Sequence, residues 1–384
     1  MPADSEGQVS RINPPASSHD TRITRSQDRG RDETGPQSES CHGVAGEPEP
    51  AEGRATLYTG TMFGSHLSIA GSLAGALREA HGLHMDTVQV FTKNQQQWKV
   101  KPLDDAVIAE WRAEVSRLGW DKGCGRDSSS GRTVAHASYL INLASPDDAL
   151  WAKSIDLMTI EIERCEALGI PYLVHHPGAY TTSSIEAGLA RITSAYREIF
   201  GRTKGFQTIS CLENTVGSGS NLGGPFEQLG RLRETIVEAT GQPQRVGFCF
   251  DTCHAHAAGY DLSTRAAAET AMAAFDTACG LAHLHVMHLN DSKGACGSRL
   301  DRHEHIGEGT IGGTPSRLGE SGFAEIVRHP ALARIPKILE TPKGESDDGT
   351  NLDTINLSRL RRLAAPNQPK ATVQTPKRTR TRNR

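Results

Sequence analysis

The stretch WAKSIDLMTIEIERCEALGIPYLVHH, residues 151–176, contains one complete helix-and-strand unit. In its first part, the apolar residues Leu157, Ile160 and Leu168 recur at a spacing of three to four positions among charged side chains, which predicts an amphipathic helix. Its last part, PYLVHH, is a short β-rich run. A helix that leads directly into a short apolar strand is the repeating unit of a parallel α/β sheet, so this stretch predicts the fold class.

The same alternation of β-rich runs and helical patterns extends along the chain in both directions. Eight such runs end near His66 (TMFGSHL), Phe91 (TVQVFT), His136 (TVAHA), His176 (PYLVHH), Glu213 (TISCLE), Asp251 (VGFCFD), His288 (LHVMH) and Glu340 (PKILE). Eight strands that alternate with helices over about 310 residues favour a closed (β/α)8 barrel, the TIM-barrel architecture, over an open sheet. The third unit is the weakest match, because its strand is short and follows a Gly/Ser/Arg-rich stretch, residues 123–132, that we expect to form an extended loop.

The two ends of the chain differ in composition from the middle. Residues 1–55 are rich in Ser, Gly, Pro, Arg and acidic residues, and residues 366–384 contain six Lys or Arg and no acidic residue. We expect both ends to be disordered tails, because neither has enough apolar side chains to offset the entropy of ordering. The expected organisation is therefore a polar tail at 1–55, a barrel domain at 56–365 and a basic tail at 366–384 that is suited to phosphate contact.

Composition narrows the classes of function. The chain has 384 residues, a formal net charge of -3 and eight scattered cysteines without a CxxC pair, which is typical of a protein in a reducing cytosol. No apolar run is long enough to cross a bilayer and the N-terminus lacks the pattern of a signal peptide, so we expect a cytoplasmic protein without membrane contact. The net charge predicts no general attraction to nucleic acid, so affinity for phosphate must come from local features.

Polar residues occupy the ends of most of the eight runs, where a buried barrel strand would otherwise stay apolar. The carboxyl ends of the strands form one face of such a barrel, and active sites lie on that face. Since side chains alternate along a strand, we expect His176 to point into the barrel mouth and His175 to point outward against a helix. With three loop residues added, the predicted cluster contains five His, two Asp and two Glu: His136, His176, Glu213, Asp251, His254, His288, Asp301, His303 and Glu340.

So many imidazoles and carboxylates in one cleft would repel one another or stay unsatisfied unless cations compensate them. Imidazole and carboxylate ligands without a converging thiolate suit zinc best, with manganese or iron as less suitable occupants. The nine side chains are enough for two or three ions, and several neighbouring metal ions typically serve displacement at phosphorus. The nearby residues that we expect to be structural are Cys249, Cys253, His256, His283, His285 and His305.

Several longer segments carry a resemblance to a known family. They are FTKNQQQW, HASYLINL, HHPGAY, LENTVGSGSNLG, VGFCFDTCHAHAAGYDL, MHLNDSKGACGSRLDRHEHIGEGTIG and ILET. In this order, over a region from about Phe63 to Thr341, they closely resemble the signature blocks of endonuclease IV, the zinc-dependent apurinic/apyrimidinic endonuclease of DNA base-excision repair. The blocks are long and contain rare residues at fixed spacing, so this signal is far more specific than one short motif.

The resemblance implies a TIM barrel with three zinc ions. It assigns one ion to His136, His176 and Glu213, a second to Glu213 with Asp251, His288 and Glu340, and a third to His254, Asp301 and His303. The implied reaction is hydrolysis of the phosphodiester 5′ to an abasic site in double-stranded DNA, which leaves a 3′-hydroxyl. Glu213 is then the bridging carboxylate and Glu340 the orienting or proton-accepting one, and we expect the enzyme to act as a monomer.

Two loops resemble the segments with which the family handles DNA. The candidate DNA-contacting residues are His66 on the first strand, Asn94 and Gln96 after the second strand, and Tyr139 and Leu140 after the third. Side chains of such loops are implied to enter the base stack while the abasic nucleotide turns out into the pocket. The sequence departs from the family pattern at Gln96, where an Arg is common, and at Ala137, where an Asp is expected, and both departures bear on DNA affinity.

Two other functions compete with this one. A sugar isomerase or epimerase of the same barrel type also holds one or two metals with Glu, Asp and His, but it would not need His136, His176 or the Asp301 and His303 pair. A DNA-binding or damage-sensing module without turnover would not need a complete ligand set with a bridging carboxylate. A nicking assay on an abasic duplex, with and without a chelator, separates the three.

Overall fold

The computed structural model describes residues 60–125 and 129–365. In these ranges one closed parallel barrel is formed by β1 (Phe63–His66), β2 (Thr87–Phe91), β3 (Thr133–His136), β4 (Tyr172–His175), β5 (Ile209–Glu213), β6 (Val246–Asp251), β7 (Leu284–His288) and β10 (Lys337–Leu339). Neighbouring strands follow the chain order, and β10 pairs with β1 to close the barrel. The predicted TIM barrel is confirmed.

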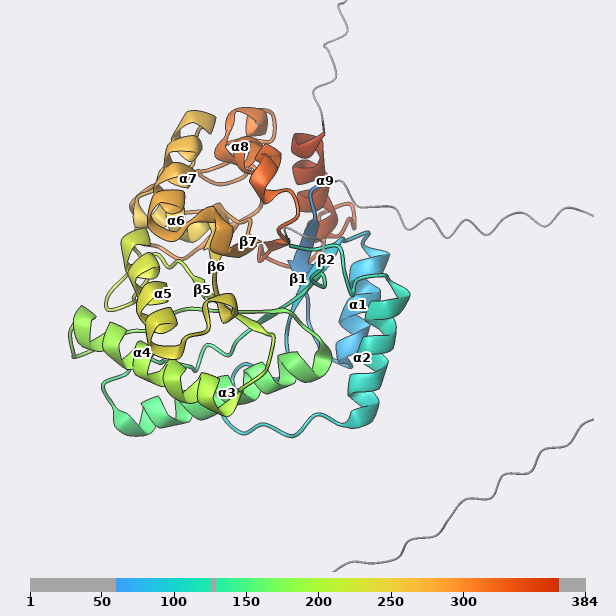
Figure 1. Ribbon diagram of the computed structural model, residues 1–384. Helices are drawn as coiled ribbons and strands as arrows, with labels where there is room; N and C mark the ends of the chain where they lie inside the picture. Colours follow the sequence, from blue (N-terminus) through green and yellow to red (C-terminus); the bar gives the residue numbers. More distant parts are fainter. Residues whose placement is uncertain (1–59, 126–128, 366–384) are drawn as a thin grey trace, which may run out of the picture. The chain divides into compact units, whose positions relative to one another are not determined.

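Helices lie outside the strands of the barrel (Figure 1). In the described residues they are α1 (Leu73–Gly82), α2 (Asp105–Arg117), α3 (Asp148–Leu168), α4 (Ile185–Arg202), α5 (Phe226–Thr240), α6 (Thr252–Ala258), α7 (Arg265–Cys279), α8 (Gly322–Arg328) and α9 (Leu352–Ala364). The α3 helix contains the segment predicted from its apolar spacing. It begins after the N-cap Asp147, whose side chain accepts the Leu150 N–H, and ends at Gly169 in the left-handed conformation, with φ of 72°.

The barrel interior is a small apolar cluster distinct from the larger core between strands and helices. Tyr172 and Val174 of β4 point into the interior, whereas Leu173 between them packs in the outer core, as the period of two along a strand requires. Six interior residues each precede a candidate ligand by two positions: Val134, Val174, Cys211, Cys249, Val286 and Ile338. The alternation therefore directs those six ligands toward the same end of the barrel.

Close strand contact explains one glycine of the barrel. Gly64 of β1 pairs with Thr87 of β2. A Cβ atom at position 64 would lie 1.9 Å from the carbonyl oxygen of Thr87, so only glycine fits between these two strands.

Some predictions lie outside the described residues. These are the two tails and residues 126–128 of the predicted loop at 123–132, in which Cys124 and Ser130 form an antiparallel bridge. The domain boundaries at 55/56 and 365/366 stay predictions. No helix in residues 60–125 or 129–365 combines the length and apolar character needed to cross a membrane.

Candidate metal centre

The candidate ligands come from the carboxyl ends of six neighbouring strands and from the segments that follow β6 and β7. The strand-end residues are His136 on β3, Glu213 on β5, Asp251 on β6 and His288 on β7, with His176 and Glu340 one residue beyond β4 and β10. His254 lies in α6, and Asp301 precedes β9 (His303–Glu304), which pairs antiparallel with β8 (Asp291–Ser292). Parallel strands end on a common rim, so these residues meet there.

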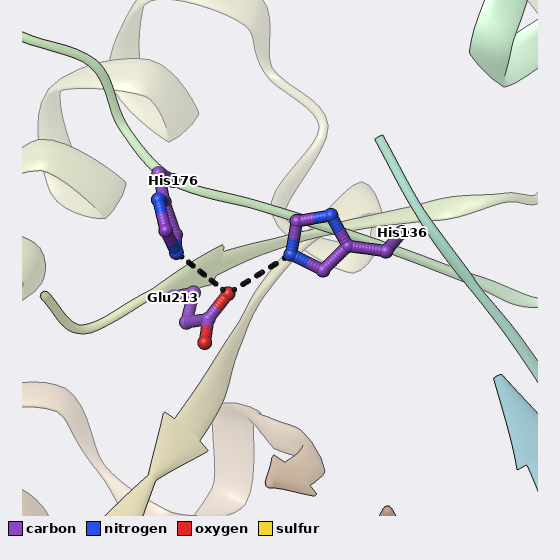
Figure 2. A group of neighbouring side chains, drawn as sticks. All are labelled: His136, His176 and Glu213. Carbon is purple, nitrogen blue, oxygen red and sulfur yellow. Dashed lines mark hydrogen bonds and ion pairs between the residues drawn. The ribbon is translucent and has the colours of Figure 1, made fainter. Parts of the chain in front are cut away.

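Glu213 lies at the centre of the cluster and is completely buried. Its Oε2 lies 3.3 Å from Nε2 of His136 and 3.3 Å from Nε2 of His176 (Figure 2). Its Oε1 lies 2.9 Å from Nδ1 of His288 and 3.3 Å from Nδ1 of His254. One carboxylate therefore faces four imidazoles, an arrangement that suits a carboxylate shared between two cations.

A second group forms around His288. Its Nδ1, which faces Glu213, also lies 3.2 Å from Oε2 of Glu340 and 3.8 Å from Oδ2 of Asp251. Three carboxylates thus surround one ring nitrogen of a completely buried histidine. Such a concentration of negative charge favours a cation at this point.

A third group lies beside the first two. Nε2 of His254 is 3.2 Å from Oδ1 of Asp301, and Nε2 of His303 is 3.4 Å from the same oxygen. Nε2 of His303 is also 3.8 Å from Oδ2 of Asp251, which links this group to the second one. The structure therefore brings all nine candidate ligands together.

Three of these histidines use one ring nitrogen for a hydrogen bond outside the ligand groups, which leaves the other ring nitrogen for a metal ion. Nδ1 of His136 donates to the carbonyl oxygen of the next residue (2.8 Å), and Nδ1 of His303 donates to the carbonyl oxygen of Glu340 (3.2 Å). Nε2 of His288 donates to Oε1 of Gln89 (2.9 Å). In a neutral imidazole, donation from one ring nitrogen leaves the other unprotonated and available as a ligand. In His303 that other nitrogen, Nε2, is buried and has no hydrogen-bond partner among the described residues.

The charges of the cluster are strongly coupled. Burial opposes protonation of His288, but the carboxylates of Glu340 and Glu213 outweigh it and raise the pKa of His288 to about 9. Burial would raise the pKa of Glu213, yet the imidazoles of His288 and His176 hold that pKa well below its usual range. Without cations the His288 imidazole holds a proton in their place, so cation binding beside His288 must release a proton.

Gln89 of β2 contacts the cluster, and the sequence analysis did not single it out. Its Nε2 donates to Oε1 of Glu340 (2.7 Å) and lies 3.0 Å from Nδ1 of His66. Its Oε1 accepts the hydrogen bond from His288, so one amide orients a carboxylate and an imidazole of the cluster. The sequence offered one sign of this role, because Gln89 is a polar side chain inside the otherwise strand-like run TVQVFT.

Two asparagines that the sequence analysis also missed orient Asp251. Nδ2 of Asn290 donates to Oδ2 of Asp251 (2.6 Å), and Oδ1 of Asn290 accepts the N–H of Glu340 (2.7 Å). Oδ1 of Asn214 accepts the N–H of Asp251 (2.7 Å). The other carboxylate oxygen of Asp251 accepts the N–H of His254 (2.7 Å), which caps α6 and places His254 beside the cluster.

Two of the residues expected to be structural, His175 and Cys249, have contacts of that kind. Nε2 of His175 lies 2.7 Å from the Tyr196 hydroxyl, on the outer side of β4, and burial lowers the pKa of His175 to about 4. Cys249 belongs to the barrel interior. Its sulfur lies within 4.8 Å of a carboxylate oxygen of Glu213 and a ring nitrogen of His288. Burial raises the pKa of the thiol well above its usual value, and a protonated thiol is a poor metal ligand.

Of the candidate DNA-contacting residues, His66 contacts the cluster directly, because its Nδ1 lies 3.3 Å from Oε1 of Glu340. Tyr139 is 62% exposed, and its ring centroid lies 5.3 Å from that of His136 and 6.4 Å from that of His176. Asn94 and Gln96 are exposed, and Leu140 is half-buried. His66 is half-buried at the edge of the cluster.

A cavity of about 230 Å³ opens beside the first group of ligands. It is lined by residues that follow β3, β4 and β5, among them Tyr139, Asn142, His176, Thr215 and Asn221. Polar side chains and one aromatic ring thus border the hollow next to the cluster.

Comparison with known proteins identifies the family. Residues 77–361 match a family model described as a xylose isomerase-like TIM barrel. The chain is 42% identical over 303 residues to the probable endonuclease 4 of Methanoculleus marisnigri, an alignment that covers 79% of this chain and 99% of that relative. This chain belongs to the endonuclease IV family.

Other endonuclease IV proteins give the same result. The probable endonuclease 4 of Trichlorobacter lovleyi is 41% identical over 301 residues, which cover 78% of this chain and 99% of that relative. The crystal structure of endonuclease IV from Thermus thermophilus aligns with a TM-score of 0.63 and 34% identity, covering 79% of this chain and 98% of that chain. A D-tagatose 3-epimerase-like protein aligns with a TM-score of 0.54 at 18% identity and shares the fold alone.

Proposed function

We propose that this endonuclease IV homologue hydrolyses the phosphodiester 5′ to abasic sites in double-stranded DNA and leaves a 3′-hydroxyl. The observation that carries the proposal is the convergence of imidazoles and carboxylates in three linked groups around the buried Glu213 carboxylate. Neighbouring metal sites of this kind are suited to displacement at phosphorus. The relatives named endonuclease 4 support the same substrate class.

The donor set fits three zinc ions, with manganese or iron as alternatives. The proposed ligands are His136, His176 and Glu213 for one ion, Glu213, Asp251, His288 and Glu340 for a second, and His254, Asp301 and His303 for a third. When bound, such ions stabilise charge that develops at phosphorus and activate water as the nucleophile.

Glu340 is the proposed orienting or proton-accepting carboxylate. Its Oε1 accepts a hydrogen bond from Gln89, and its Oε2 faces His288. Burial would raise the pKa of Glu340, but the neighbouring His288 and His66 hold it well below its usual range. The carboxylate is therefore ionised at neutral pH and can accept a hydrogen bond from the attacking water, which orients that water.

DNA contacts are proposed for the loops at the mouth. Tyr139 and Leu140 follow β3, and Asn94 and Gln96 follow the adjacent β2, so both pairs border the same part of the rim. An exposed aromatic ring such as Tyr139 is suited to stacking in an opened duplex. His66 contacts the catalytic carboxylate from β1, and the cavity beside the cluster is the proposed place for the extrahelical sugar.

A nicking assay on a duplex with one abasic site tests this function. We expect incision on the 5′ side of the site, loss of incision after prolonged chelation, and recovery when zinc is restored. The matched control is the same duplex without the lesion. Binding without incision would indicate a damage-sensing module, and turnover of a ketose sugar without incision would indicate an isomerase.

A further inference from the structure

One buried carboxylate contacts both of the loops that follow β2 and β3. Glu161 of α3 is 1% exposed. Its Oε2 accepts a hydrogen bond from the hydroxyl of Thr92, the first residue after β2, at 2.9 Å. Its Oε1 accepts the backbone N–H of Ser138, two residues after β3, at 3.2 Å. A side chain on an outer helix thus connects the bases of two loops from adjacent strands.

Lys93 extends this contact along the first loop. Its ammonium lies 3.6 Å from Oε1 of Glu161 and is itself buried. The same ammonium donates to the carbonyl oxygens of Asn94 (2.9 Å) and Gln97 (3.0 Å). The backbone of the β2 loop therefore wraps around the Lys93 ammonium, which also faces Glu161.

Ser138 and Arg164 complete the connection. The hydroxyl of Ser138 donates to the carbonyl oxygen of Gln95, which joins the two loops directly. Nε of Arg164, on the same helix as Glu161, donates to the carbonyl oxygen of Thr92 (3.1 Å). Helix α3 and both loops thus form one continuous polar network.

Global stability is a poor explanation for this network. Burial raises the pKa of Glu161 and lowers the pKa of Lys93, which means that burial opposes the charged form of both partners. The desolvation of a buried ion pair can offset its attraction, whereas the geometry that it fixes is retained. The positions fixed here adjoin the candidate DNA-contacting residues Asn94, Gln96, Tyr139 and Leu140.

We propose that Glu161 is a positioning residue that holds the β2 and β3 loops in one relative arrangement before DNA binds. The inference rests on the proposed function, because its benefit is a pair of loops already placed to enter the base stack of an abasic duplex. A preorganised surface loses less conformational entropy on binding. Removing the carboxylate therefore weakens duplex binding and leaves the metal cluster intact.

The test compares Glu161→Gln with Glu163→Gln, which changes an exposed residue of the same helix. The amide keeps the volume of the side chain but loses the charge that faces Lys93. In the DNA-free protein we expect hydrogen exchange at the Ser138 amide to accelerate roughly tenfold in Glu161→Gln. On the abasic duplex we expect KM to rise roughly tenfold, with kcat and zinc content unchanged. The Glu163→Gln variant should match the wild type in each measurement.

Several outcomes would overturn the inference. Unchanged exchange at Ser138 would show that Glu161 does not fix the loop, and faster exchange with an unchanged KM would show that loop order is irrelevant to binding. A kcat that falls as far as KM rises would place the effect in the cluster instead. If Glu161→Gln does not fold, Ser138→Ala, which removes the hydroxyl bond to Gln95, must raise KM about threefold or the inference fails. A wild type that does not incise abasic DNA overturns the proposed function and this inference together.

Discussion

Gln89 contacts two proposed ligands without being a ligand itself. It donates to Glu340 and accepts from His288, so the substitution Gln89→Leu keeps much of the volume and removes both contacts. We expect kcat for abasic incision to fall about 10- to 100-fold while the circular dichroism spectrum stays that of the wild type. A variant with the wild-type rate would show that the orientation of these ligands does not depend on the amide.

The coupled charges at His288 predict how pH affects the metal-free protein. The pKa of His288 is about 9 in the folded chain against 6.5 for an ordinary histidine. Because the folded value is the higher one, the stabilisation is complete below about pH 6.5 and is lost as pH rises through about 9. We expect the chelated protein to lose about 1–3 kcal/mol of unfolding free energy over this window.

Thermal unfolding at pH 6.5 and pH 9.5, with chelator and with zinc, measures this effect. The zinc-loaded protein should lack the decrease, because the ions replace the protons. A chelated protein that becomes more stable toward pH 9.5 would contradict the proposed coupling between His288 and its carboxylates.

At the scale of elements, Asp291 of β8 holds the segment that follows β9. Its buried carboxylate accepts the N–H groups of Gly307 (2.8 Å), Ile311 (3.0 Å) and Gly312 (3.0 Å). In Asp291→Asn, an NH2 group replaces one of the two carboxylate oxygens. This NH2 group cannot accept the backbone N–H groups that point at it. We expect a loss of about 2–4 kcal/mol in unfolding free energy and of about one bound zinc, since β9 carries His303.

Calorimetry and elemental analysis of Asp291→Asn check this prediction. Retention of all the zinc at wild-type stability would show that β9 keeps its position without the carboxylate. The exposed Asp347→Asn, in the loop before α9, is the matched control and should change neither quantity.

The strands and their inward faces were predictable from the sequence, because the alternation of side chains between the two faces of a strand is a local property. In β5, Cys211 points into the interior and Glu213 follows on the same face, as the run TISCLE indicates. Roles that depend on a neighbouring strand were not predictable in this way. Asn290 acts on Asp251 of β6, and Gln89 acts on residues of β7 and of the segment after β10, so neither run alone reveals the contact.

At the scale of the whole molecule, the convergence of the candidate ligands was predictable because barrel closure brings the carboxyl ends of all strands to one rim. His136 and His288 are far apart in sequence, yet both face Glu213. The distances within the cluster and the link from Glu161 to two loops needed the structure, because they depend on how side chains from different segments pack. The assignments of ligands and of DNA contacts remain predictions.

The basic tail at 366–384 lies outside the described residues and carries a prediction from charge alone. Its six Lys or Arg without acidic residues should release counterions from duplex DNA. Removing residues after Ala365 should weaken duplex binding at low salt and flatten the salt dependence, with kcat at saturating substrate unchanged. Titrations by fluorescence anisotropy over a salt series measure this. A truncated chain with the same affinity and slope would show that the tail makes no phosphate contact.

The zinc content of the purified chain tests the shared-carboxylate centre most directly. Elemental analysis should give about three zinc ions per wild-type chain, about one in Glu213→Ala, which loses the ligand common to two ions, and about two in His303→Ala. One ion or none in the wild type, or equal losses in the two variants, would contradict the account.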